Sequence, residues 1–108
     1  MKKATYLIRV QNNGNIETES RAGYIFNYAG YSFGVTNYKK YEFMDAPRKV
    51  KKWIISELQT GYKLTECARR ADSIEAVKNI VDDKSRAAIL KNSIAAAVDR
   101  FGVINTDL

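Results

Sequence analysis

The sequence contains no histidine, the side chain that most often acts as a general base near neutral pH and that most often binds zinc. It also lacks the glycine-rich loops of P-loop and dinucleotide-binding proteins. The closest carboxylate pair, Asp82 and Asp83, is adjacent in sequence, so the two cannot face each other on a helix, and a helix boundary explains them better. We therefore expect a protein that is not an enzyme and that uses no cofactor and no metal ion.

Cysteine and long apolar runs are equally scarce. Cys67 is the only cysteine, which excludes an internal disulfide and favours a reducing compartment. No stretch approaches the roughly 20 apolar residues of a membrane span. The apolar run after Lys2 and Lys3 is interrupted by Arg9 and has no small-residue cleavage site, unlike a secretion signal. We expect a cytoplasmic protein with no membrane association.

Proline occurs once and aromatic residues make up 11% of the 108 residues, a composition that argues against disorder and for one domain. The charge is uneven. Residues 1–71 hold 13 basic and 6 acidic residues, a net of +7, whereas residues 72–108 hold 5 and 6, a net of −1. Such a basic excess favours polyanions or acidic protein surfaces. Ordinary solubility charge explains it equally well.

The first two-thirds of the chain alternates with the period of β-strands. Residues 4–11 read as a strand, and Asn13-Gly14 is the pair that type I′ hairpin turns prefer. The return strand, residues 16–20, is polar, which predicts a sheet edge. Two further hairpins carry β-branched and aromatic residues. Their strands are expected at residues 24–28 and 31–36 around Ala29-Gly30, and at residues 52–58 and 62–67 around Gln59-Thr60-Gly61. Gly34, inside a strand, indicates a bulge.

The period changes to 3.6 after residue 71. Asp72 and Glu75 form a capping-box arrangement at the start of a short helix. Its apolar stripe is Ile74, Val77, Ile80 and Val81. A second helix is expected over about residues 85–101, capped by Asp82, Asp83 or Ser85 and ended by Gly102. Its stripe is Ala87, Leu90, Ile94, Ala97 and Phe101. A short tail would then dock through Val103 and Ile104.

These elements predict a single α+β domain over residues 1–108, mainly β in residues 1–71 and helical in residues 72–102. The expected architecture is an antiparallel sheet of about five or six strands followed by two C-terminal helices packed on one face. The small residues of the final helix would allow close approach of a second copy, but packing on its own sheet explains them better. A monomer and a homodimer both stay open.

The segment between the second and third hairpins is the densest in basic and aromatic residues. We expect a connection over residues 37–52. Tyr41, Phe43 and their neighbours allow a strand to extend into it, and Asp45-Ala46-Pro47 would break that strand. Aromatic faces stack on bases, and lysine or arginine neutralises phosphates. A core role for the aromatics and an edge-protecting role for the lysines is the competing interpretation. The candidate binding residues are Tyr38, Lys39, Lys40, Tyr41, Arg48, Lys49, Lys51 and Lys52.

Three short motifs carry a resemblance. These are Trp53-Ile54-Ile55-Ser56-Glu57, Thr60-Gly61-Tyr62-Lys63-Leu64 and Ser73-Ile74-Glu75-Ala76-Val77. The pattern of a tryptophan strand, a Thr-Gly turn and a Glu-Ala helix resembles short accessory proteins of phages and conjugative elements. Residues 23–26 and 31–35 fit the same group, and the resemblance covers about 60 residues. It implies an accessory protein of a mobile element, a class that includes anti-CRISPR proteins and small DNA-binding factors. A three-stranded sheet followed by a helix is also similar to the DNA-binding domains of some phage integrases.

The leading hypothesis is a small non-enzymatic phage or mobile-element protein that binds and inhibits a host protein or nucleoprotein complex, such as a CRISPR nuclease. The alternative is a direct DNA- or RNA-binding protein that uses a basic-aromatic sheet face. An enzyme comes third, because the usual catalytic groups are missing. It stays open because a nuclease built on lysine, arginine and tyrosine needs no histidine.

Overall fold

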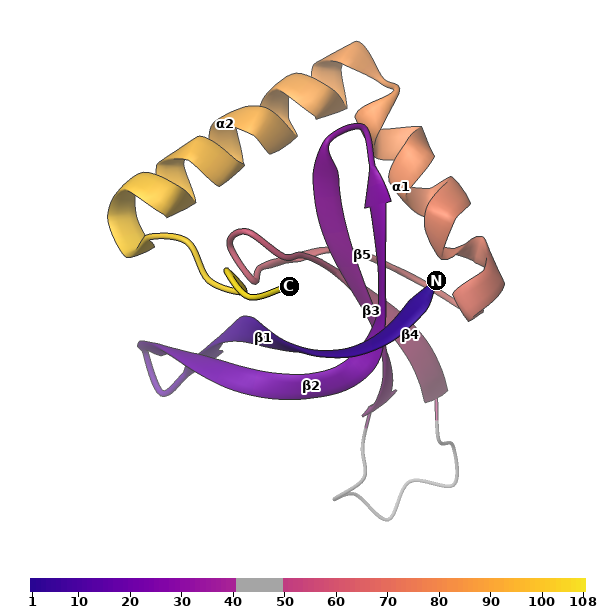
Figure 1. The fold of residues 1–108 in the computed structure, drawn as a ribbon, viewed down its shortest axis with the longest axis horizontal. Helices are drawn as coiled ribbons and strands as arrows, with labels where there is room; N and C mark the ends of the chain where they lie inside the picture. Colours follow the sequence, from indigo (N-terminus) through magenta and orange to yellow (C-terminus); the bar gives the residue numbers. More distant parts are fainter. Residues whose placement is uncertain (41–49) are drawn as a thin grey trace.

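The computed structural model describes the backbone of residues 1–40 and 50–108, and the side chains of residues 1–37 and 52–108. Five strands follow one another: β1 (Lys2–Asn12), β2 (Asn15–Tyr28), β3 (Tyr31–Lys40), β4 (Val50–Glu57) and β5 (Lys63–Cys67). A 3₁₀ turn (Arg70–Asp72) then leads into α1 (Ser73–Val81) and α2 (Lys84–Phe101). The strands form one antiparallel sheet in the order β1-β2-β3-β4-β5, and the two helices follow it in the chain (Figure 1). The expected α+β architecture is confirmed.

Both expected tight turns are present. Asn13 and Gly14 have φ of 51° and 82°, and Ala29 and Gly30 have φ of 53° and 84°. Two consecutive left-handed residues are the requirement of a type I′ hairpin turn. Local sequence therefore sets the register of the first two hairpins.

The strand boundaries differ from expectation in two places. Residues 16–20 and 24–28 belong to one continuous strand, β2, and not to two. As expected, its first half lies at an edge, because β2 pairs with β1 from Asn15 to Ile25 but with β3 only from Tyr24 to Tyr28. The expected connection over residues 37–52 is shorter, because Asn37–Lys40 continue β3 and pair with Val50–Trp53 of β4. The expected break at residues 45–47 lies outside the described residues.

The core lies on the face of the sheet that α1 covers. Phe33, Val35, Ile55 and Val77 are fully buried there. Aromatic residues of β2, β3 and β4 pack around them, namely Phe26, Tyr28, Tyr31 and Trp53. Phe26, Tyr28 and Tyr31 therefore belong to the core and offer no open platform for stacking bases. At the same time, they explain why the strands form, since a pleated, half-buried surface favours aromatic and β-branched side chains.

The opposite face is closed by Tyr6, whose ring lies over Gly34. A Cβ atom at position 34 would lie 2.5 Å from Cζ of Tyr6. Gly34 is thus required by the close approach of an aromatic ring and not by a bulge, and the expectation of a bulge there is wrong. The register shift of this sheet lies at Ile55/Ser56.

The helices begin differently from each other. Asp72 has helical dihedral angles and makes no side-chain cap, so the expected capping box is wrong. Its carboxylate accepts hydrogen bonds from the Arg69 guanidinium at 3.0 and 3.2 Å. A capping side chain needs an extended backbone, which Asp83 has, and Asp83 accepts from the Arg86 N–H at 3.0 Å. Ile74 is exposed, and Ala76 packs against the core in its place.

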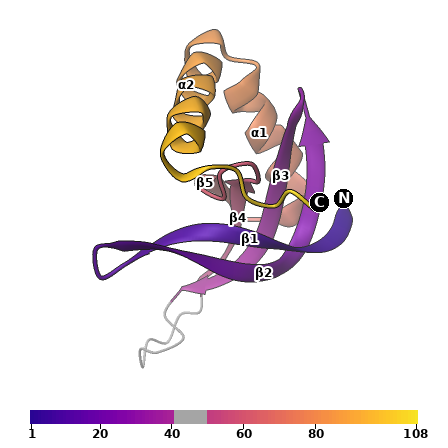
Figure 2. The same ribbon diagram turned by 60° about the vertical axis from the view of Figure 1, so that its left-hand side comes forward.

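The sheet curls until the free edge of β1 meets the β4–β5 turn. The Arg9 N–H donates to the Gly61 carbonyl at 2.8 Å, and the Ile104 N–H of the C-terminal tail donates to the Gln59 carbonyl at 3.0 Å. Figure 2 shows this tail running beside β1. The tail docks through Ile104, as expected, while Val103 is exposed. Among the described residues, no helix is long and apolar enough to cross a membrane.

Candidate binding surface

Arginine 70 lies over two aromatic rings at one end of the sheet. Its guanidinium carbon is 4.1 Å from the centroid of the Tyr24 ring and 6.0 Å from that of Trp53. The two rings are tilted by 55°, with centroids 6.4 Å apart. Three elements create the cluster, because Tyr24 belongs to β2, Trp53 to β4 and Arg70 to the 3₁₀ turn before α1. Cation–π contact of this kind orients the guanidinium and leaves its N–H edges available to a partner.

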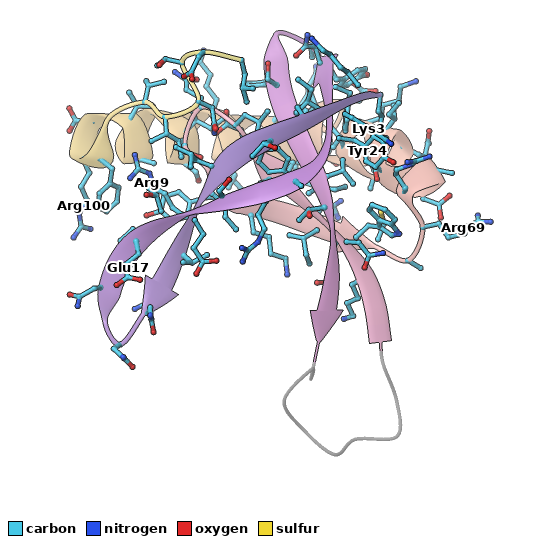
Figure 3. All side chains as sticks on the ribbon, turned by 60° about the horizontal axis from the view of Figure 1, so that its bottom comes forward. Lys3, Arg9, Glu17, Tyr24, Arg69 and Arg100 are labelled. Carbon is cyan, nitrogen blue, oxygen red and sulfur yellow. The ribbon has the colours of Figure 1, made fainter. Side chains whose placement is uncertain are left out.

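Further basic residues surround the stack. Lys3 is the register partner of Tyr24 on β1, and Arg69 precedes Arg70. Figure 3 shows Lys3, Tyr24 and Arg69 on the same side of the molecule, away from Arg9 and Arg100. A hollow of about 440 Å³ lies here, lined by Met1, Tyr24, Trp53, Arg70 and Ala71. We call this region the basic–aromatic end and define it as Lys3, Tyr24, Trp53, Arg69 and Arg70. Lys52 lies next to it on the other face of β4, because successive residues of a strand point to opposite faces.

Acidic residues neutralise part of the basic charge at this end of the sheet and next to it. Glu66 accepts from Lys52 at 2.7 Å and from Lys63 at 2.9 Å. These two hydrogen bonds, first that of Lys52 and then that of Lys63, lower the pKa of Glu66 to about 2. Arg69 is paired with Asp72. Within the described part of the chain, Lys3 and Arg70 make no ion pair. They are the basic groups that remain for a partner.

The sequence-predicted residues lie beside this region. The register places Tyr38 opposite Lys52, Lys39 opposite Lys51 and Lys40 opposite Val50. Beyond Val35, β3 no longer pairs with β2, and β5 pairs with β4 only as far as Trp53. The last rungs of β3 and β4 therefore form a two-stranded ribbon. The ribbon brings together Tyr38, Lys39, Lys40, Lys51 and Lys52. Tyr41, Arg48 and Lys49 lie outside the described residues.

Sequence reasoning missed Lys3, Tyr24 and Arg70. The Arg69-Arg70 pair just before a helix was a visible signal, since such residues are exposed and close to the first turn. Their convergence on Tyr24 and Trp53 depends on the register of three strands, which no local pattern contains.

Two features bear on metal binding and on the single cysteine. No group of three or more His, Cys, Asp or Glu residues that could hold a metal ion occurs in residues 1–37 and 52–108. Cys67 donates to the Arg69 carbonyl at 3.1 Å and lies 3.5 Å from the Ser73 hydroxyl. Two of its neighbours, Trp53 and Ser73, are part of the packed end of the sheet and the start of α1. This environment suits a structural thiol.

None of the family models, curated proteins or solved structures compared with the chain matches it.

Proposed function

We propose that this protein is a non-enzymatic binding protein that attaches to an acidic macromolecular surface through its basic–aromatic end. The observation that carries the proposal is Arg70, held over Tyr24 and Trp53 with no acidic partner among the described residues. The guanidinium lies over the Tyr24 ring, and its donors still suit the bidentate recognition of carboxylate or phosphate. Tyrosine, tryptophan and arginine are also the residues that dominate binding energy at interfaces.

The partner that we propose is a host nucleoprotein of a defence system, such as a CRISPR nuclease, which binding would inhibit. Two independent points support this choice. The sequence resembles accessory proteins of mobile elements in β4, which contains Trp53, and in α1, which follows Arg70. A nucleoprotein also offers both acidic protein surfaces and phosphates, which the same cations would recognise.

A direct DNA- or RNA-binding function is the second candidate, and the ribbon favours it. The major groove of B-DNA admits a two-stranded β-ribbon. The ribbon formed by β3 and β4 carries basic residues on both strands, with Lys39 opposite Lys51 in register. Base stacking on the open sheet is not part of this candidate, because Phe26, Tyr28 and Tyr31 pack against the core.

The experiment that tests the proposal compares Arg70→Glu with Lys91→Glu. Both substitutions change the charge by the same amount, but Lys91 is exposed on α2, away from the basic–aromatic end. The wild type and the Lys91→Glu variant should capture the same nucleoprotein from a nuclease-treated host lysate, and Arg70→Glu should not. Equal capture by all three proteins would contradict the proposed surface.

Fluorescence anisotropy separates the two candidates. Labelled single-stranded DNA, double-stranded DNA and RNA are titrated at about 50 and 200 mM salt, where binding through phosphates weakens steeply. Tight binding that is lost at the higher salt, and abolished by Lys39→Glu with Lys51→Glu, identifies direct nucleic-acid binding. No binding at the lower salt removes this second candidate.

A further inference from the structure

A groove on the other side of the molecule runs between α2 and the β4–β5 turn. Its volume is about 500 Å³, within the range of about 300–1,000 Å³ usual for small-molecule sites. The α2 residues that line it recur every three or four positions and so form one face of the helix. The apolar part of the lining is Leu64, Ile80, Ile89, Leu90, Ile94 and Ala97. Leu90 and Ile94 are buried, whereas Ile89 at the rim is 65% exposed.

The charges of the groove leave one cation without a partner. Glu57 is buried in the lining, but its carboxylate accepts hydrogen bonds from the N–H groups of Gln59 and Thr60 and from the Thr60 hydroxyl. Lys63 is paired with Glu66. In the described part of the protein, the Arg86 guanidinium makes no ion pair and no hydrogen bond. A ligand that neutralises the Arg86 guanidinium carries a single negative charge.

The position of Arg86 strengthens this conclusion. It lies in the first turn of α2, which also begins with Lys84 and contains no acidic residue. Cations are unfavourable at this end of a helix. The N-cap residue Asp83 offsets part of this cost, and an anion held by Arg86 inside the groove would offset more of it.

The dimensions of the groove select the form of the ligand. Its lining extends along α2 from Arg86 to Ala97, a rise of about 16 Å. A ligand that covers this lining is therefore long and mainly apolar.

We propose that this groove binds a long-chain monocarboxylate, with the apolar chain lying along Leu64, Ile94 and Ala97 and the carboxylate at Arg86. The site is separate from the basic–aromatic end and does not depend on the function proposed for it. The apolar lining would remove the chain from water, and the guanidinium would hold the carboxylate by two parallel hydrogen bonds.

Isothermal titration calorimetry with dodecanoate, below its micelle concentration and on the full chain, tests the proposal. Saturable 1:1 binding is expected, with dodecyltrimethylammonium at least about tenfold weaker because its head group is repelled by Arg86. Arg86→Gln should weaken dodecanoate by about tenfold, as expected for the loss of a charged hydrogen-bonded pair. Lys91→Gln should have no effect.

A blocking variant makes the test independent of charge. Ser93 is exposed and lines the groove, so Ser93→Trp should fill it and abolish binding while circular dichroism shows a folded protein. Asn92→Trp, on the next exposed position outside the groove, should bind like the wild type. Unchanged binding by Ser93→Trp, equal binding of the cationic amphiphile or absence of saturable binding would overturn the proposal. So would a concentration-dependent dimer that Ser93→Trp dissociates, because the occupant would then be a second copy.

Discussion

The side chain of Asn105 pairs with the backbone of Leu7 as a neighbouring strand would. Its Oδ1 accepts from the Leu7 N–H at 2.6 Å, and its Nδ2 donates to the Leu7 carbonyl at 2.9 Å and to the Leu58 carbonyl at 2.8 Å. One amide thus joins the free edge of β1 to the β4–β5 turn. Asn105 also has φ of 58°, a conformation that asparagine tolerates better than most residues.

Replacing this amide should loosen the C-terminal tail and the edge of β1 together. Asn105→Ala removes three hydrogen bonds, each worth about 1 kcal/mol, so we expect a loss of about 3 kcal/mol in the free energy of unfolding. Urea unfolding followed by circular dichroism measures it. Asn92→Ala, on an exposed face of α2, should change stability by less than about 0.5 kcal/mol. A similar effect of both substitutions would show that the tail does not hold the edge.

The turn at Ala29 should be open to improvement. Ala29 is exposed and adopts φ of 53°, which costs an L-residue with a Cβ about 1–2 kcal/mol. Ala29→Asn creates the Asn-Gly pair preferred in type I′ turns, and we expect it to stabilise the protein by about 1 kcal/mol. A rise in the midpoint of thermal unfolding would be the readout. An unchanged or lowered midpoint would mean that this turn is not strained.

The hydroxyl of Tyr6 should contribute little to folding at neutral pH. It is buried, and no hydrogen bond of normal geometry reaches it among the described residues, although the nearby Thr36 hydroxyl opposes the rise of its pKa. Since an unpaired buried hydroxyl is costly, Tyr6→Phe should be as stable as the wild type or more stable, by up to about 1 kcal/mol. If urea unfolding shows that Tyr6→Phe lowers the free energy of unfolding by more than about 1 kcal/mol, the hydroxyl makes a stabilising hydrogen bond and the prediction is wrong.

The same residue predicts a difference in alkaline stability. Burial raises the pKa of Tyr6 from 10.0 to about 12. A raised pKa in the folded state means that the associated stability is present below pH 10 and is lost as the pH rises from 10 to 12. At about 1.4 kcal/mol for each pKa unit, the wild type should lose about 2–3 kcal/mol more over this range than Tyr6→Phe. Parallel loss in both proteins would contradict the burial of this hydroxyl.

How far the sequence predicts this molecule depends on how local each feature is. Asn13-Gly14 and Gly102 encode their own backbone conformations, so the first turn and the end of α2 were predictable. The glycine at position 34 was misread because the ring that requires it comes from β1, far away in the sequence. The prediction of a capping box was wrong because Asp72 belongs to the 3₁₀ turn and has helical dihedral angles, which a capping residue lacks.

The candidate site follows the same division. Local density of lysine and tyrosine pointed to residues 38–52, and the register does bring Tyr38 and Lys52 together. The contact of Arg70 with Tyr24 and Trp53 joins three separate elements. Such a contact follows from the twist and register of the sheet, which composition and periodicity do not specify.

Removing a neutralising carboxylate should strengthen polyanion binding. Glu66→Gln would free Lys52 and Lys63 from their shared partner and raise the net charge from +6 to +7. We expect tighter retention on a polyanionic resin and a steeper dependence on salt. Glu17→Gln makes the same change of charge at the tip of the β1–β2 hairpin (Figure 3) and should have a smaller effect. Equal effects would indicate that only net charge matters.

The most direct measurement is the salt concentration at which the protein elutes from immobilised heparin, a linear polyanion that stands in for an acidic partner. The wild type, Arg70→Glu and Lys91→Glu are compared on one column. Arg70→Glu should elute at a much lower salt concentration than Lys91→Glu, because it reverses the cation that Tyr24 and Trp53 hold in place. Identical elution of the two variants would show that the basic–aromatic end is not the binding surface.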